Sequence, residues 1–230
     1  AVTNNANGTY TATLTATVAG AIGIDGTIDG SPIADTATVT FVAGAISAAN
    51  STVQIAPTSI AASSGSAQST VTVTVRDANN NPVAGATVLL AASGSGNTVT
   101  QPGATTNASG VATGTVSSTV AAAKTISATA NGTPITQTQT LTVTPAAAAG
   151  ATTTITSNTG SITTDGSATI TVQARDEFGN AVTVGGATVV LGTTVGSLTA
   201  VTDVGNGTYT ATLTSTATGS ATISGTINGN

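Results

Sequence analysis

The sequence predicts an all-β protein built from tandem antiparallel β-sandwich domains, of which the first and the last are incomplete. Two observations carry this prediction. Segments recur at a period near one hundred residues, which is the size of a small domain rather than of a solenoid repeat. Within each period, apolar residues alternate with threonine and serine, as in strands with one buried face.

The repeats define the domain boundaries. The segment AVTNNANGTYTATLT at Ala1–Thr15 returns as AVTDVGNGTYTATLT at Ala200–Thr214, and a weaker copy lies at Thr105–Thr119. A second block, Thr70–Leu90, matches Thr169–Leu191. We therefore expect three units: the C-terminal part of a repeat over 1–49, a complete repeat over 50–146, and a repeat over 147–230 that lacks its last strand.

The last strand of each repeat is expected directly after a tight turn. Asp29-Gly30 precedes SPIADTATVTFVAG in the first unit, and Asn131-Gly132 precedes TPITQTQTLTVTP in the middle unit. Such dipeptides are strong hairpin signals. The third unit reaches the equivalent turn, Asn228-Gly229, without the strand that follows. Either the 230 residues are a window of a longer polypeptide, or a neighbouring chain supplies the strand.

The remaining strands are predicted from strict alternation. The segment TVTVTVRD at Thr70–Asp77 places its three valines on one face and its threonines on the other. TYTATLTATV at Thr9–Val18 places Tyr10 and Leu14, with two alanines, on one face in the same way. Because aromatic residues make up only 2% of the chain, we expect thin cores of Val, Ile, Leu and Ala.

The composition excludes several functions. Charged residues make up 5% of the chain, against about 25% in ordinary domains. Three Lys and Arg give no basic patch, so nucleic acid is not an expected partner. The absence of His and Cys excludes Ser-His-Asp and Cys-His catalysis and imidazole or thiolate metal sites. No apolar run is long enough to span a membrane as a helix.

The few charged residues are the candidates for functional sites. Arg76-Asp77 and Arg175-Asp176 hold the same position in two units. A local ion pair or turn hydrogen bond is the simplest interpretation, and an inter-domain or inter-chain contact is the alternative. For Asp176-Glu177 we expect a solvated turn rather than a general acid/base pair, because adjacent side chains on a strand point apart.

No catalytic, cofactor or metal-binding residue is predicted. Calcium needs six to eight oxygen ligands, so solvated loops are expected for the scattered aspartates, with a structural calcium ion as the alternative; they are Asp25, Asp29, Asp35, Asp165 and Asp203. Lys124, the only lysine, is not expected to form an isopeptide crosslink.

Rows of threonine are expected to be the wet faces of sheets rather than an ice-binding array. In so Thr-rich a chain, most matches to the N-glycosylation pattern are expected to arise by chance; they begin at Asn7, Asn50, Asn107, Asn131 and Asn206.

The order of these elements resembles a known family. VTVTVRDANNNPVAGATVLL, TTNASGVATGTVSST and KTISATANG follow one another in the middle unit, and ARDEFGNAV, TDVGNGTYTATLTS and SATISGTING repeat that order in the third. This order is similar to the group 1 bacterial immunoglobulin-like domain of the invasin and intimin type. The resemblance implies immunoglobulin-like sandwiches in a stalk that projects an adhesive tip from a bacterial surface.

We therefore expect a non-catalytic spacer in the stalk of a large, extracellular bacterial adhesin, with neighbouring immunoglobulin-like repeats as its partners. The alternative is a subunit of a self-assembling filament, or homo-oligomeric fibre, joined by strand complementation or lateral packing. A glycan-binding module is a third option, which lacks the exposed aromatic residues that such sites use.

Overall fold

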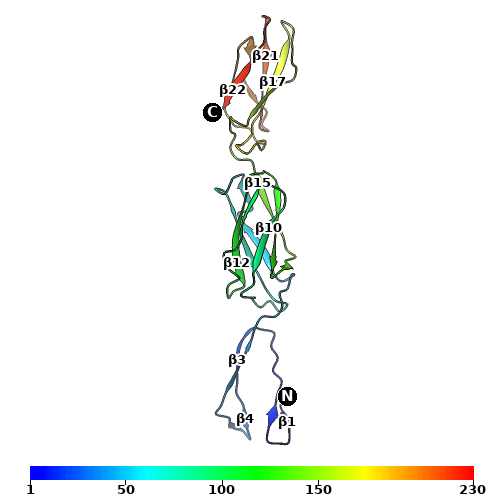
Figure 1. Ribbon diagram of the computed structural model, residues 1–230, viewed down its shortest axis with the longest axis vertical. Helices are drawn as coiled ribbons and strands as arrows, with labels where there is room; N and C mark the ends of the chain where they lie inside the picture. The colour runs from blue at the N-terminus through cyan, green and yellow to red at the C-terminus, as the bar shows by residue number, and fades with distance from the viewer.

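A computed structural model describes all 230 residues, and the chain forms three units that lie end to end in a rod (Figure 1). Every regular element is a β-strand, which confirms the predicted all-β class. The structure contains no helix that is long and apolar enough to cross a membrane.

The middle unit is a complete two-sheet sandwich. One sheet has the order β11-β12-β9-β7; the other has the order β10-β13-β15-β8, with β14 beside β13. All pairs are antiparallel except β15 with β8, which run parallel. The strands are β7 (Thr52–Ala56), β8 (Ser59–Ala61), β9 (Ser69–Thr74), β10 (Val88–Ala92), β11 (Asn97–Thr100), β12 (Val111–Ser118), β13 (Ala123–Ala130), β14 (Thr133–Pro134) and β15 (Gln139–Thr144).

The core of the middle unit lies between its two sheets. Val71, Val73 and Val75 are fully buried, as the alternation of this segment predicts. Eighteen buried residues, all of them Val, Ile, Leu or Ala, form one continuous cluster drawn from both sheets. No large aromatic side chain fills this core. The free energy gained by burying apolar surface is therefore the sum of small contributions from every strand.

The third unit has the same plan without its closing strand. One sheet has the order β16-β17-β21-β19, with β20 beside β21, and a two-stranded sheet pairs β18 with β22. Its core is divided into clusters of four and three buried residues. The strands are β16 (Thr154–Ser157), β17 (Ser167–Gln173), β18 (Val189–Thr193), β19 (Ser197–Leu198), β20 (Thr202–Asp203), β21 (Thr208–Thr214) and β22 (Ile223–Ile227).

The first unit consists of hairpins without an opposing sheet. The pairs are β1 with β2, β3 with β6 and β4 with β5, and no residue before Ser51 is buried. This confirms that both end units are incomplete. The strands are β1 (Thr3–Asn4), β2 (Tyr10–Thr11), β3 (Gly20–Ile24), β4 (Thr27–Ile28), β5 (Ser31–Pro32) and β6 (Ala37–Phe41).

The predicted strand over Thr9–Val18 is wrong for most of its length, because only Tyr10–Thr11 is a strand. Its copy in the third unit, β21, pairs along its whole length with β17 and buries Tyr209. Tyr10 is 55% exposed and Tyr209 is 2% exposed. The same residues thus form a strand only where a partner strand lies beside them.

The turns follow the sequence signals. Asp29-Gly30, Asn131-Gly132 and Asn228-Gly229 all have positive φ at both residues, with Asn131 at 46° and Gly132 at 81°. Two consecutive residues with positive φ make the type I′ turn that suits the twist of a hairpin. The two predicted hairpin turns, Asp29-Gly30 and Asn131-Gly132, are therefore confirmed, and Asn228-Gly229 has the same turn conformation.

Gly110, in the turn before β12, is required for two reasons. Its φ is 74°, in the left-handed region, and a Cβ at this position would lie 2.5 Å from the carbonyl oxygen of Val75. At the equivalent Gly207, which also has positive φ, a Cβ would overlap a different backbone carbonyl, that of Val182. Gly132 provides a contrast, because its φ is 81° but no atom lies within 4 Å of a Cβ there.

We predict that Gly110→Ala destabilises the middle unit more than Gly132→Ala does. Both substitutions place alanine in the left-handed region, which costs about 1–2 kcal/mol. Only Gly110→Ala adds overlap with a backbone carbonyl. Urea unfolding of the two variants measures the difference in the free energy of unfolding, and equal losses would contradict the steric argument.

Candidate functional site

The two junctions between units are built around the loop that follows β9 and β17. We call these loops, Arg76–Asn81 and Arg175–Asn180, the junction loops. In the first, Asp77 Oδ1 accepts hydrogen bonds from the backbone N–H groups of Asn79 and Asn81, both at 2.8 Å. An aspartate that accepts from amides two and four residues onward folds the chain into a turn.

The second junction loop repeats this geometry. Asp176 Oδ1 accepts from the N–H groups of Phe178, at 3.0 Å, and Asn180, at 2.9 Å. Asn80 and Gly179 occupy the same place in the two loops, with φ of 66° and 84°. Asn and Gly are the residues that tolerate this backbone conformation best.

The second carboxylate oxygen binds outside the turn. Asp77 Oδ2 accepts from the N–H of Gly44 and from the side-chain amide of Asn81, both at 2.8 Å. Asp176 Oδ2 accepts from the N–H of Ala146 at 2.9 Å and from the Asn180 amide at 2.8 Å. Gly44 and Ala146 follow the closing strands of the preceding units, so each carboxylate is bonded to the chain that links two units.

The asparagine at the end of each junction loop binds the preceding unit directly. Asn81 Nδ2 donates to the carbonyl of Thr17, and its Oδ1 accepts from the N–H of Ala19, both at 2.9 Å. Asn180 makes the same two bonds, also at 2.9 Å, to the carbonyl of Thr119 and the N–H of Ala121. Since one amide satisfies both a donor and an acceptor of the backbone, the contact fixes an orientation as well as a position.

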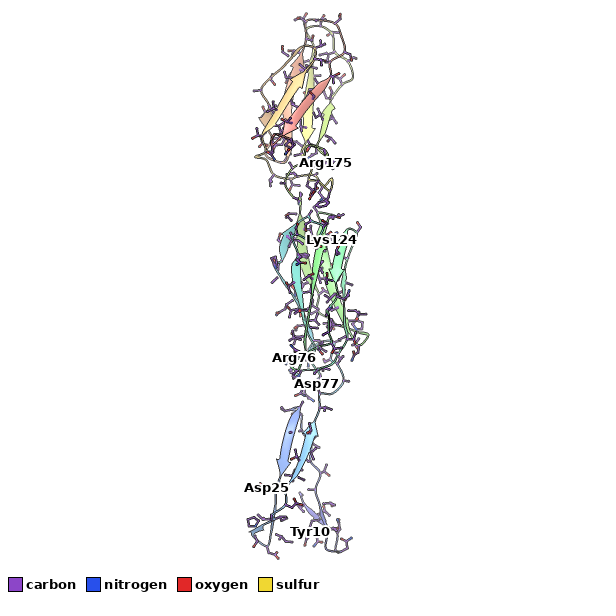
Figure 2. All side chains as sticks on the ribbon, turned by 60° about the vertical axis from the view of Figure 1, so that its left-hand side comes forward. Tyr10, Asp25, Arg76, Asp77, Lys124 and Arg175 are labelled. Atoms are coloured by element: carbon purple, nitrogen blue, oxygen red, sulfur yellow. The ribbon has the colours of Figure 1, made fainter.

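We call the aspartate and asparagine together the junction clasp: Asp77 with Asn81 in one junction, and Asp176 with Asn180 in the other. Figure 2 places Arg76 and Asp77 at the narrow point where the middle unit meets the first.

The linker itself is held against the clasp. The N–H of Ser47 donates to the carbonyl of Arg76 at 2.8 Å, and the N–H of Ala149 donates to that of Arg175 at 2.7 Å. Ser51 Oγ accepts from the N–H of Arg76 at 3.0 Å, on the same strand end. The short segments between units are therefore paired with the following unit rather than free.

The clasp carboxylates are buried and bonded to N–H donors. Asp77 is 2% exposed and Asp176 is fully buried. The hydrogen bond from the Asn81 side chain, followed by that from the N–H of Gly44, lowers the pKa of Asp77 from 3.8 to about 2. Burial acts to raise the pKa of Asp176, but the bonds from the Asn180 side chain and the N–H of Ala146 outweigh it, and the pKa is lowered.

The arginine beside each aspartate has a separate role. Arg76 Nη1 donates to the carbonyl of Asn80 at 2.7 Å, and Arg175 Nη1 donates to that of Gly179 at 2.8 Å. Each guanidinium thus holds the carbonyl of the residue with positive φ. The expected local ion pair is replaced by two sets of hydrogen bonds to backbone and amide groups.

These contacts decide between the sequence-based alternatives. The inter-domain interpretation holds for the two aspartates, which bond to Gly44 and Ala146, and it coexists with the predicted turn hydrogen bonds. The two arginine side chains bond only within their own loops. The prediction of a solvated turn is wrong for Asp176, because the preceding unit and the linker cover it. Glu177, the next residue, is exposed, so the two carboxyl groups face different surroundings.

The asparagines of the clasp were not singled out from the sequence. A signal was present, since Asn follows Asp by four residues in both junction loops. Its meaning required the preceding unit, whose backbone the amide binds.

The remaining candidates are not brought together. No three acidic side chains gather where they could hold a metal ion. Asp203 accepts from the N–H groups of Gly186 and Gly205, which fixes a loop of the third unit. Lys124 is 2% exposed, and its amine donates to the carbonyl of Ser95 at 2.8 Å.

Comparison with known families agrees with this architecture. Residues 1–44 and 149–230 match the family of invasin domain 3, and residues 50–144 match the bacterial Ig-like domain of group 1. No curated protein sequence matches the chain.

Solved structures show the same arrangement. The chain is similar to the Escherichia coli adhesin FdeC, with a TM-score of 0.60 and 23% identity over 100% of this chain and 76% of that one. Invasin, described as a bacterial integrin-binding protein, has a TM-score of 0.57 and 24% sequence identity, and the match covers 90% of this chain. InvD of Yersinia pseudotuberculosis has a TM-score of 0.50 and 35% sequence identity, and the match covers 78% of this chain.

The chain spans 42% of the invasin structure and 53% of the InvD structure. More than half of the residues of this chain match the first family, and most of the remaining residues match the second, which has the same fold. The chain therefore belongs to the invasin domain 3 family of tandem bacterial Ig-like domains, which are non-catalytic domains of surface adhesins.

Proposed function

We propose that the chain is a structural spacer in the extracellular stalk of a bacterial surface adhesin. The observation that carries the proposal is the repetition of the junction clasp: the same side chains make the same bonds to the preceding unit at both junctions. A spacer has to hold its units in one orientation, and a repeated contact between units supports that role.

The clasp resists bending in a specific way. The asparagine amide bonds the N–H and C=O of two residues in the preceding unit, while the aspartate bonds the linker. Together these contacts tie the third unit to Thr119, Ala121 and Ala146, so a tilt that separates the units at this point breaks them. Each hydrogen bond contributes about 0.5–1.5 kcal/mol net.

We predict that Asn180→Ala loosens the junction between the middle and third units. The substitution removes both amide bonds to the preceding unit and the bond to Asp176. The third unit should lose about 1–3 kcal/mol of stability, because two or three net hydrogen bonds disappear. Because the chain has no cysteine, Thr113→Cys and Thr169→Cys provide unique sites for spin labels, and the distance distribution between them should widen.

The matched control is Glu177→Ala, which changes an exposed residue of the same junction loop. The Glu177 side chain forms no hydrogen bond, so the distance distribution of the Glu177→Ala variant should equal that of the parent chain. A narrow, unchanged distribution in Asn180→Ala would contradict a role of the clasp in rigidity.

We also predict that the clasp weakens at low pH. The folded pKa of Asp77, about 2, lies below the unfolded value of about 3.9, so its carboxylate contributes full stability above about pH 4. That contribution is lost as the pH falls toward 2. The urea midpoint should therefore fall steeply between about pH 5 and 2.

The comparison for this prediction is the double variant Asp77→Asn with Asp176→Asn. Its stability at neutral pH should be lower, because an amide nitrogen cannot accept the linker N–H. Its midpoint should change less over the same pH range. Parallel pH profiles for the two chains would show that the loss arises elsewhere.

A filament subunit is the second candidate, and the low charge of the chain is the observation that favours it. With three Lys and Arg against eight Asp and Glu, neighbouring chains repel each other little.

Sedimentation velocity over a wide range of protein concentration separates the two candidates. The spacer is expected to remain monomeric, since its contacts lie within one chain. A sedimentation coefficient that grows with concentration would favour the filament.

A further inference from the structure

Three surface turns carry the same tripeptide, Asn-Gly-Thr, at Asn7–Thr9, Asn131–Thr133 and Asn206–Thr208. The tripeptide fits the Asn-x-Ser/Thr pattern of N-glycosylation, in which a sugar is joined to the side-chain nitrogen of the asparagine. All three asparagines are exposed, so exposure does not distinguish them. The hydrogen bonds of their side-chain amides do.

The amide oxygen of Asn206 is held by two donors from one residue. The hydroxyl group of Thr208 donates to Asn206 Oδ1 at 2.6 Å, and the backbone N–H of Thr208 donates to the same oxygen at 3.0 Å. Asn206 Nδ2 forms no hydrogen bond, and the residue is exposed. The side chain therefore combines a bound oxygen with a free nitrogen that faces solvent.

Asn7 has the same geometry in the first unit. The hydroxyl group of Thr9 donates to Asn7 Oδ1 at 2.6 Å, the N–H of Thr9 donates to it at 3.1 Å, and Asn7 Nδ2 is free. All of these bonds lie within three consecutive residues. The geometry is therefore a property of the turn itself, since it forms in two units whose surroundings differ.

Asn131 shows that the tripeptide alone does not produce this geometry. Its Oδ1 accepts a single hydrogen bond, from the N–H of Thr87 at 2.8 Å, and the hydroxyl group of Thr133 forms no bond with it. Asn131 has a φ of 46°, and Thr133 pairs with Ala130 across the hairpin. The hairpin thus fixes the same three residues in an arrangement that separates the hydroxyl group from the amide.

The two other matches to the pattern also lack the hydroxyl contact. The oxygen of Asn107 accepts from two backbone N–H groups, and the hydroxyl group of Ser109 forms no bond with it. The nitrogen of Asn50 donates to two backbone carbonyls of the first junction loop, so it is not free. A hydroxyl group bound to the amide oxygen occurs together with a free nitrogen only at Asn7 and Asn206.

The turn that carries Asn206 is exposed in a complete unit as well. Gly110 and Gly207 are equivalent, because each carbonyl accepts the N–H of the residue before a junction loop, at 2.8 and 2.9 Å. Residues 107–109, which precede Gly110, are exposed although both sheets of the middle unit are in place. The accessibility of this turn is therefore a feature of the sandwich.

The contact at Oδ1 changes the chemistry of the amide. An amide nitrogen is a weak nucleophile because its lone pair is shared with the carbonyl group. When the nitrogen attacks and loses a proton, negative charge moves onto the amide oxygen. Two donors already directed at that oxygen stabilise the charge as it develops, in the way that an oxyanion hole does.

We propose that Asn7 and Asn206 are glycosylation sites, at which Nδ2 accepts a sugar from a glycosyl diphosphate. A bond forms between Nδ2 and the anomeric carbon of the sugar. The bond from that carbon to the diphosphate oxygen breaks, and its electron pair leaves with the diphosphate. One Nδ2 proton passes to a base of the transferase that delivers the sugar. The sites are independent of the role of the chain as a spacer.

The test compares Asn206 with Asn131 in the full chain, because both lie in the same tripeptide. One arm supplies UDP-glucose and a soluble bacterial N-glucosyltransferase. The other supplies a lipid diphosphate-linked oligosaccharide and a membrane oligosaccharyltransferase. Synthetic peptides of residues 200–214 and 125–139 are treated in the same way, and mass spectrometry of fragments measures the initial rate at each asparagine.

The rate at Asn206, divided by the rate in its peptide, should exceed the same ratio for Asn131 by at least about tenfold. A well-placed donor to an oxygen that gains charge is worth at least that much. The division removes the preference of each transferase for flanking residues. The arm in which this difference appears identifies the source of the sugar, and equal ratios at the two asparagines in both arms would overturn the proposal.

The hydroxyl contact itself is tested with Thr208→Val and Thr133→Val. Valine keeps the branched shape of threonine and its preference for strands, so both variants should unfold near the urea midpoint of the parent chain. In nitrogen-15 spectra the Nδ2 signals of Asn206 should shift in the first variant. Those of Asn131 should move much less in the second, because only Thr208 bonds its asparagine. Unchanged Asn206 signals would remove the contact on which the proposal stands.

Discussion

A buried carboxylate without a cationic partner is the interaction on which both junctions depend. A charge inside a protein is costly unless donors surround it. Asp77 meets this condition with four N–H groups: two from its own loop, one from the Asn81 side chain and one from the linker at Gly44. The loop exists in this form because the carboxylate gathers these donors.

The rest of each junction depends on this carboxylate. The carboxylate stabilises the turn, the turn positions the asparagine, and the asparagine amide bonds the backbone of the preceding unit. The amide binds main-chain atoms, so the bonds themselves involve no side chain of the preceding unit. The two contacted segments are nevertheless the same tripeptide, Thr-Val-Ala, at Thr17–Ala19 and Thr119–Ala121.

A second constraint is the thinness of the cores. With two Phe, two Tyr and no Trp in the chain, no single side chain organises a unit, and burial accumulates only when both sheets are complete. The middle unit shows the complete case, with one cluster of eighteen residues. The third unit, short of one strand, has two small clusters, and the first unit has no buried residue.

Much of the fold could be predicted from local pattern. The strict alternation at Thr70–Asp77 predicts a half-buried strand, and the structure has one. The Asn-Gly and Asp-Gly dipeptides predict hairpin turns, since few other residues accept positive φ. The same reasoning failed at Thr9–Val18, because alternation describes what a segment does when a partner is present and cannot report that the partner is missing.

The sequence by itself determined the repeat, the strand character of most segments, the turns and the absence of chemistry that needs His or Cys, because these depend on residue type and spacing. Only the tertiary structure decided that Asp176 is buried and that Asn180 binds another unit. It also decided that Tyr10 lies exposed while its copy, Tyr209, lies in a core. These outcomes depend on which backbone lies opposite a residue, and residues far apart in the chain supply that backbone.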